Sequence, residues 1–500
     1  MSIDEEKGQG IVHKTPGEKD ALDMDSSDKP DQGAAGPKQG GVLAQLRNLE
    51  ASMDAKLGIE SEAIVRKRAE DKKDVPWTEE LTMALLWASG TMNTSCFATG
   101  FLGWQFGLSL KQAILITLFA SILGGNRNWL LCDIRCRHGI ATDECQQGWA
   151  AVSCITGGLA LTAVSDGHVS LILGIIILAV VALLISFVGL NAILVYERYA
   201  WAVFFVIFLI IFGETGKYAD NSTPASSTGA TLSGAALSLI AIVYGSSAAW
   251  CTTASDYYVH YRADVSRTKV FLMTSFGIAI PTSIGMLAGC VVASSLNNQP
   301  EWRDTYERDG LGYLIQDVLY PRGFAKFLLT LLVLSGINTN VISIYSASLS
   351  FQQLARPLAL IPRFVWTLVS FACILALAVG GREQLNTYLQ NFLSLLGYWC
   401  TSYAIILLEE HYIFRKGKFE NYDLEGWNDP ARLPLGIGAA IAFGLGVVSW
   451  CMGMNQTWFV APLAKAVGDN GGDVANELTF VVTALGYLPA RYLELRMIGR

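Results

Sequence analysis

From Leu81 onward the sequence is a succession of apolar runs separated by short polar segments. A bilayer core about 30 Å thick needs roughly 20 mainly apolar residues for each spanning helix. Only 16% of the residues are charged, against about 25% in an average soluble domain. Runs of the required kind centre on twelve positions: Phe97, Leu118, Ile155, Leu178, Val206, Ile242, Leu287, Leu334, Ala372, Leu396, Phe443 and Val482. The pattern predicts an all-α integral membrane protein with twelve transmembrane helices.

The polar head of the chain differs sharply from the rest. Residues 1–80 are rich in Lys, Asp, Glu, Gly and Ser and contain few aromatic residues. Such a segment cannot bury enough apolar surface to offset its loss of conformational entropy. We therefore expect a disordered cytoplasmic tail over 1–80 and a transmembrane transporter domain over 81–500.

The basic residues of the short loops predict the orientation. Loops that lie inside when the amino terminus is cytoplasmic hold more Lys and Arg than the outside loops, which predicts that both termini are cytoplasmic. The sequon at Asn221 then lies in an outside loop, where it is a candidate glycosylation site.

Two predicted spans contain residues that disturb a helix. Ser89 and Gly90, with Gly100 and Gly103, lie in the first span, and a Gly-Ser-Ser run at 245–247 lies in the sixth. Irregular backbone is tolerated in a membrane where it lines a cavity in the protein. Interrupted helices at equivalent places indicate a five-plus-five inverted repeat, with two extra helices following it. Glycines also permit close helix packing, which is the alternative explanation.

Several classes of protein are excluded by what the sequence lacks. It contains no Gly-x-x-x-x-Gly-Lys-Ser/Thr phosphate loop, no plausible catalytic triad and no metal-ligand quartet, so we expect no enzyme, cofactor or metal site. No long basic stripe suggests a nucleic-acid partner. Secondary transport driven by an ion gradient remains; the oligomeric state is open.

A series of short motifs resembles the fungal purine-cytosine permease branch of the nucleobase:cation symporter-1 family. The motifs include YERYAW at 196–201, SRTKVF at 266–271, GYW at 397–399, LPLG at 433–436 and GMNQTW at 453–458. Their order and spacing carry the resemblance from about Trp87 to Arg500. It implies a plasma-membrane transporter with an inverted-repeat fold that takes up cytosine or a purine together with a proton.

The resemblance also implies a binding site for a flat heterocycle between aromatic side chains of the third and sixth helices. The matching positions are Trp149 and Trp250. Stacking of a base on an aromatic ring contributes about 1–3 kcal/mol. Without the resemblance, a tryptophan in a membrane helix is more often an interfacial anchor.

In the eighth helix the family pattern is close to Asn-Asn-x-Pro-Asn-x-Tyr-Ser, and this chain reads TNVISIYS at 339–346. Asn340 matches, whereas Thr339 and Ser343 replace asparagines and Ile342 replaces the proline. These polar groups are expected to bind the edge of the ring, unless they only form hydrogen bonds between helices. The substitutions leave a pyridoxine- or thiamine-type vitamin open as the cargo.

Further polar residues lie in the first, fifth and sixth spans. Ser89 and Thr91 are candidates to face the substrate, although such residues often bond to their own helix. Glu197 and Asp256 are candidates for proton coupling, because a charge inside a bilayer is costly and usually functional. The alternatives are an interfacial pair of Glu197 with Arg198 and a capping role for Asp256.

The segment between Gly125 and Gly148 departs from the family pattern. It is strongly charged, and the apolar run from Trp149 to Val164 has only 16 residues, which is short for a span. Either polar residues complete the third helix against the cavity, or the segment reflects a mis-spliced gene model, which we favour. The second reading implies a defective paralogue that does not transport.

Overall fold

The computed structural model describes residues 41–57, 77–136, 146–187, 190–250, 253, 266–354, 356–423, 426, 429 and 431–499. Asp256 and residues 137–145 lie outside the described residues, as does most of the segment 1–80. Within that segment the structure has a helix, α1 (Val42–Leu57), and α2 begins at Trp77. Disorder in the rest of residues 1–80 stays a prediction.

Each of the twelve predicted spans is centred in or beside a helix. The first consists of α2 (Trp77–Thr91) and α3 (Thr94–Gln105). The others are α4 (Leu110–Cys136), α5 (Gln146–Val164), α6 (Leu171–Ser186), α7 (Leu190–Thr215), α8 (Gly229–Ala248), α10 (Arg267–Ser295), α13 (Arg322–Leu354), α15 (Arg363–Gly381), α16 (Leu385–Glu409), α17 (Ile437–Gly453) and α18 (Ala475–Ile498). By length and composition, seven described helices can cross a membrane, and four shorter apolar helices accompany them. The predicted all-α membrane architecture is confirmed.

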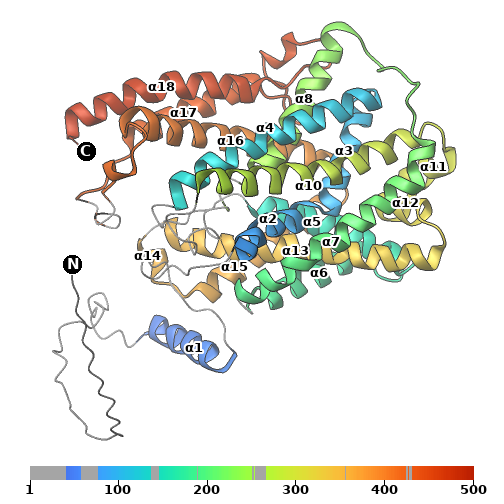
Figure 1. Ribbon diagram of the computed structural model, residues 1–500, viewed down its shortest axis with the longest axis horizontal. Helices are drawn as coiled ribbons and strands as arrows, with labels where there is room; N and C mark the ends of the chain where they lie inside the picture. Colours follow the sequence, from blue (N-terminus) through green and yellow to red (C-terminus); the bar gives the residue numbers. More distant parts are fainter. Residues whose placement is uncertain are drawn as a thin grey trace, which may run out of the picture.

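The helices that contribute residues to the candidate site surround the first span (Figure 1). Helix α10 packs against α2, α3 and α4, while α13 packs against α5 and α6. Helix α16 lies between α8 and the final pair, α17 and α18, which run side by side. Between α10 and α13 the chain forms two short helices, α11 (Pro300–Asp309) and α12 (Leu311–Val318), of which α12 contacts α5.

The first span is interrupted, as expected, but not at the predicted residues. Ser89 and Gly90 are helical, and the break comes at Met92 and Asn93. Asn93 has an extended backbone and begins α3 as its N-cap, so the new helix starts in a changed direction.

The sixth span is not interrupted at the predicted residues 245–247, because α8 continues through them to Ala248. The helix gives way to a turn at Ala249, and Trp250 is helical again. Gly245 serves close packing instead: a Cβ atom there would lie 1.9 Å from the carbonyl oxygen of Leu393 in α16. After Trp250, and apart from Thr253, the chain lies outside the described residues as far as Ser266.

The third span is longer than the expected 16 residues. Helix α5 begins at Gln146 and has 19 residues, because the glutamines and glycine before Trp149 are also helical.

A cluster of charged side chains joins the final helix pair to α16. Arg491 of α18 pairs with Glu410, at 3.0 Å, and with Glu494, at 3.1 Å. Glu494 also accepts the backbone N–H of Gly436 at 2.8 Å, next to the start of α17. An acidic group at a helix N-terminus satisfies free N–H groups and favours the helix dipole. This cluster attaches α17 and α18, the two helices that follow the repeat, to the end of α16.

Glycines bring α3 and α10 unusually close together. A Cβ atom on Gly289 would lie 2.0 Å from the carbonyl oxygen of Phe97, and one on Gly100 would lie 2.1 Å from that of Met286. Both obstacles are backbone atoms, which cannot move without shifting a helix. Small residues at such crossings permit the van der Waals contact that holds membrane helices together.

We therefore expect Gly289→Ala to destabilise the protein by about 1–3 kcal/mol, the usual cost of overpacking. The measurement is thermal unfolding of the purified protein in detergent. Gly444→Ala is the matched control, since a Cβ atom at Gly444 of α17 meets nothing within 4 Å. Equal melting temperatures for Gly289→Ala and the parent protein would contradict this account of the crossing.

Candidate functional site

The break in the first span is held by side-chain hydrogen bonds. The Asn93 carboxamide oxygen accepts the N–H of Cys96 at 2.9 Å. Its Nδ2 donates to the carbonyl of Gly90 at 2.8 Å and to Thr339 Oγ1 of α13 at 3.1 Å. Thr339 Oγ1 also lies 3.1 Å from the Gly90 carbonyl. One side chain thus satisfies both ends of the break and attaches it to α13.

Three other predicted ligand residues bond to their own helices. Thr91 donates to the Trp87 carbonyl at 2.7 Å, and Ser343 donates to that of Thr339 at 2.8 Å. Asn340 donates to the Gly336 carbonyl at 2.8 Å, and its oxygen lies 3.5 Å from Cys154 Sγ of α5. All three side chains are fully buried. They lie inside the bundle, where a solute can reach them only if it enters between the helices.

Glu197 is the predicted site residue with the most distinctive surroundings. It is fully buried in α7, and its Oε2 accepts hydrogen bonds from Ser89 of α2 and, at 2.8 Å, from Asn338 of α13. Its Oε1 has no hydrogen-bond partner among the described residues. The alternative of an interfacial pair is wrong, because Arg198 instead donates to Thr82 at 3.2 Å.

Trp250 lies against the broken span. Its indole, 1% exposed, meets the indole of Trp87 edge to face, with ring centroids 5.9 Å apart and planes at 63°. A Cβ atom on Gly90 would lie 3.7 Å from Trp250 Cη2 and 3.0 Å from Ile342 Cδ1. The absence of a side chain at Gly90 therefore lets Trp250, just beyond the end of α8, and Ile342 of α13 approach α2.

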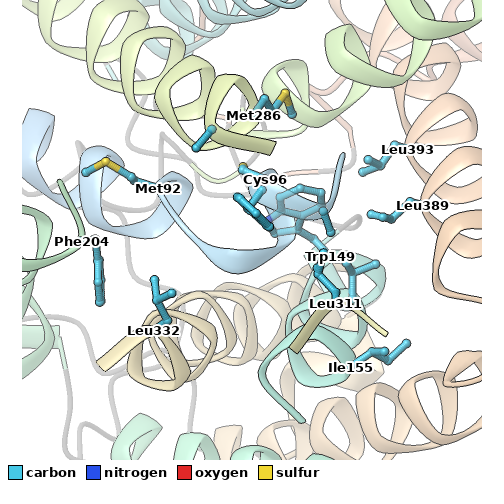
Figure 2. Packing of buried hydrophobic residues seen from close by; sticks show 14 of the residues in the cluster. Met92, Cys96, Trp149, Ile155, Phe204, Met286, Leu311, Leu332, Leu389 and Leu393 are labelled. Carbon is cyan, nitrogen blue, oxygen red and sulfur yellow. The ribbon is translucent and has the colours of Figure 1, made fainter. Parts of the chain in front are cut away.

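Trp149 lies on the other side of the break. It is also 1% exposed, and Figure 2 shows it among Cys96, Leu311, Leu389 and Leu393, which belong to α3, α12 and α16. Its indole N–H has no hydrogen-bond partner among the described residues. The interfacial-anchor alternative requires an indole at the surface, and neither Trp149 nor Trp250 is there.

Sequence reasoning did not select several residues that the structure brings to this region. They are buried polar or aromatic side chains around the break: Trp87, Thr94, Ser153 and Thr156. Ser95 lies 3.0 Å from Ser153 and 3.1 Å from Thr156, which ties α3 to α5. The available signal was a polar residue within an apolar run, but that signal does not identify its partner on another helix.

The chain can now be compared with known proteins. A family profile for permeases of cytosine/purines, uracil, thiamine and allantoin matches residues 145–471. The chain belongs to this permease family. A purine-cytosine permease of Emericella nidulans is 32% identical over 468 residues, covering 89% of this chain and 91% of the relative. A purine-cytosine permease of Saccharomyces cerevisiae is 30% identical over 488 residues, covering 90% and 91%.

A relative with a different cargo is almost as similar to this permease. The vitamin B6 transporter of Saccharomyces cerevisiae is 29% identical over 539 residues, covering 92% of both chains. Among solved structures, a nucleobase-cation-symport-1 family transporter with bromovinylhydantoin bound superposes with a TM-score of 0.59. It is 14% identical, and the match covers 87% of this chain and 96% of the other. At that identity the likeness establishes the transporter fold alone.

Proposed function

We propose that this permease is a plasma-membrane transporter that takes up a nucleobase, cytosine or a purine, together with a proton. The observation that carries the proposal is the pair of buried indoles, Trp149 on α5 and Trp250 just beyond the end of α8, on either side of the break in the first span. A planar ring held by indole faces gains stacking energy whatever its substituents. The relatives named as purine-cytosine permeases support this class of cargo.

Recognition of the ring edge needs polar groups that can exchange their present hydrogen-bond partners for the ring. Asn340 and Thr339 supply donors and acceptors from α13, with Ser343 one turn further along, and Ser89 and Thr91 supply hydroxyls from α2. In the proposal, a bound ring replaces the hydrogen bonds that these groups make within their own helices. A buried polar group that loses its partner discriminates strongly against a wrong ligand.

Trp250→Ala should weaken binding of a nucleobase roughly tenfold or more, in keeping with the 1–3 kcal/mol of one stacking contact. Trp250→Phe, which keeps a ring, should lose less. The measurement is competition against labelled cytosine in cells that lack their own carriers, with surface expression followed in parallel. Trp458→Ala is the control, since that indole is 62% exposed. Unchanged affinity in Trp250→Ala would remove the stacking role.

Proton coupling is assigned to Glu197 in this proposal. A carboxylate inside a bilayer costs about 2.5–3.5 kcal/mol or more when it is charged and unpaired. Among the described residues the donors to Glu197 are neutral: Ser89 of α2 and Asn338 of α13, which lies beside the break. A proton on Glu197 therefore changes hydrogen bonds to α2 and α13 at once. Asp256, outside the described residues, stays a second candidate.

Glu197→Gln carries a permanently neutral group, so concentrative uptake driven by a proton gradient should fall to the background level. Exchange of labelled for unlabelled substrate across the membrane, which needs no net proton movement, should persist. Glu214→Gln, at the other end of α7, is the matched control. Full gradient-driven accumulation by Glu197→Gln would exclude the coupling role.

A vitamin of the pyridoxine kind is the second candidate cargo. The vitamin B6 transporter among the relatives favours it, as do the hydroxyls of Thr339 and Ser343 at positions where the family pattern has asparagine. For the nucleobase proposal, excess unlabelled cytosine or hypoxanthine should suppress uptake of labelled cytosine at least tenfold more effectively than pyridoxine. The reverse order would favour the vitamin. Accumulation of either cargo against its gradient would eliminate the reading as a non-transporting paralogue.

The orientation belongs to the same proposal. With both termini cytoplasmic, the loop that carries Asn221 lies outside the cell. Asn221 is exposed, and its neighbours Ser222 and Thr223 donate backbone hydrogen bonds to Asp220 at 2.9 and 3.0 Å. An exposed, ordered sequon of this kind is accessible for glycosylation.

A further inference from the structure

A second buried carboxyl group lies away from the proposed substrate site, in the segment of residues 454–474 that joins α17 to α18. Asp473 is 1% exposed and accepts a hydrogen bond from the hydroxyl of Tyr398 in α16. It also accepts the backbone N–H groups of Asn455 at 3.1 Å and Ala475 at 3.2 Å. In the described part of the chain no lysine or arginine pairs with it.

The joining segment packs directly on the first half of α8. A Cβ atom on Gly234 would lie 2.4 Å from the carbonyl oxygen of Gly471, so the two backbones are in contact. The N–H of Asp473 donates to Ser238 Oγ of α8 at 3.3 Å. Asp473 therefore lies where α8, α16 and the start of α18 meet, and it becomes exposed to water only if these elements separate.

A third buried side chain, Gln456, joins the hydrogen-bonded pair of Asp473 and Tyr398. Gln456, 1% exposed, donates through Nε2 to the Tyr398 hydroxyl at 2.8 Å, and its Oε1 has no partner among the described residues. With a charged Asp473, donation runs from Gln456 to Tyr398 to Asp473. With a proton on Asp473 and the amide rotated by 180°, donation runs in the opposite direction. The cluster can thus satisfy Asp473 both with and without a proton.

The surroundings favour the protonated form. Burial raises the pKa of Asp473 to about 6, even though the Tyr398 hydroxyl and the two backbone N–H groups lower it, and the Glu477 carboxyl of α18 raises it further. Helices α8 and α17 contribute no charged residue, and Lys465 and Asp469 of the joining segment are exposed.

We propose that Asp473, Tyr398 and Gln456 form a second proton-binding site, and that a proton bound there closes the contact of α16 with residues 454–474. An aspartate in water has a pKa of about 3.9. Because the pKa of Asp473 is higher in the closed contact, closure is strongest below about pH 4 and weakens as the pH rises from about 4 to about 6, above which it weakens no further. With both termini inside, the contact faces the exterior, so an acidic exterior closes the outer side. Substrate identity and Glu197 play no part in this inference.

The test places a thiol inside the contact. Ala461 is fully buried in the cluster that contains Tyr398, and Ala461→Cys reports separation through its rate of maleimide labelling, read by peptide mass spectrometry on the purified full chain. At each pH, the labelling rate of Ala461→Cys is divided by the labelling rate of the double variant that also carries Asp473→Asn. The asparagine mimics a protonated Asp473. The ratio should rise from about two at pH 4 to roughly a hundredfold at pH 7.5, with most of the rise between pH 4 and pH 6, because the pKa values of the open and closed forms differ by about two units.

Asp469→Asn, on an exposed carboxyl of the same segment, should leave the rise in the ratio unchanged. A ratio that stays flat with pH overturns the proposal, and so does faster labelling of Asp473→Asn at every pH, which would mean that the charge holds the contact closed. If Asp473→Asn does not fold, the labelling of Ala461→Cys is followed against pH in a protein that carries Tyr398→Phe instead. Loss of a donor to the carboxylate must move the labelling midpoint to higher pH, and an unchanged or lower midpoint overturns the proposal.

Discussion

A break in a membrane helix leaves backbone donors and acceptors that lipid cannot satisfy. In this permease Asn93 resolves the problem by capping α3 and by bonding to Gly90 and Thr339. Two of these bonds are local, and the bond to Thr339 ties the break to α13. The same contact brings polar groups of two helices to one point of an otherwise apolar bundle. Every functional assignment at the site depends on that junction.

Two kinds of contact surround the junction, and they differ in how easily they change. The glycine crossings, such as Gly289 against Phe97 and Gly245 against Leu393, bring backbones together and leave little room for adjustment. The hydrogen bonds of Glu197 join side chains, which can change partners without moving a helix backbone. A transporter needs both, because rigid elements transmit a movement that small changes at a site initiate.

Glu197 and Asp473 are both buried carboxyl groups, and each must be satisfied by hydrogen bonds within the protein. Each has neutral hydrogen-bond donors from neighbouring helices and, in the part of the chain that the structure describes, no basic partner. A carboxyl in such a place is sensitive to the arrangement of the helices around it, since separation exposes it to water. In the two proposals, one group couples the proton to the cargo, and the other responds to pH at the contact between α16 and the 454–474 segment.

The sequence by itself determined the membrane class, the twelve spans and the family, because apolar length and motif order are local properties of the chain. It also selected Glu197, Trp149 and Trp250 as candidates. Only the tertiary structure decided where the first span breaks, that residues 245–247 remain helical, and that Glu197 bonds to Ser89 and Asn338 rather than to Arg198. These outcomes depend on partners far away in the chain, and a polar or small residue does not specify its partner on another helix.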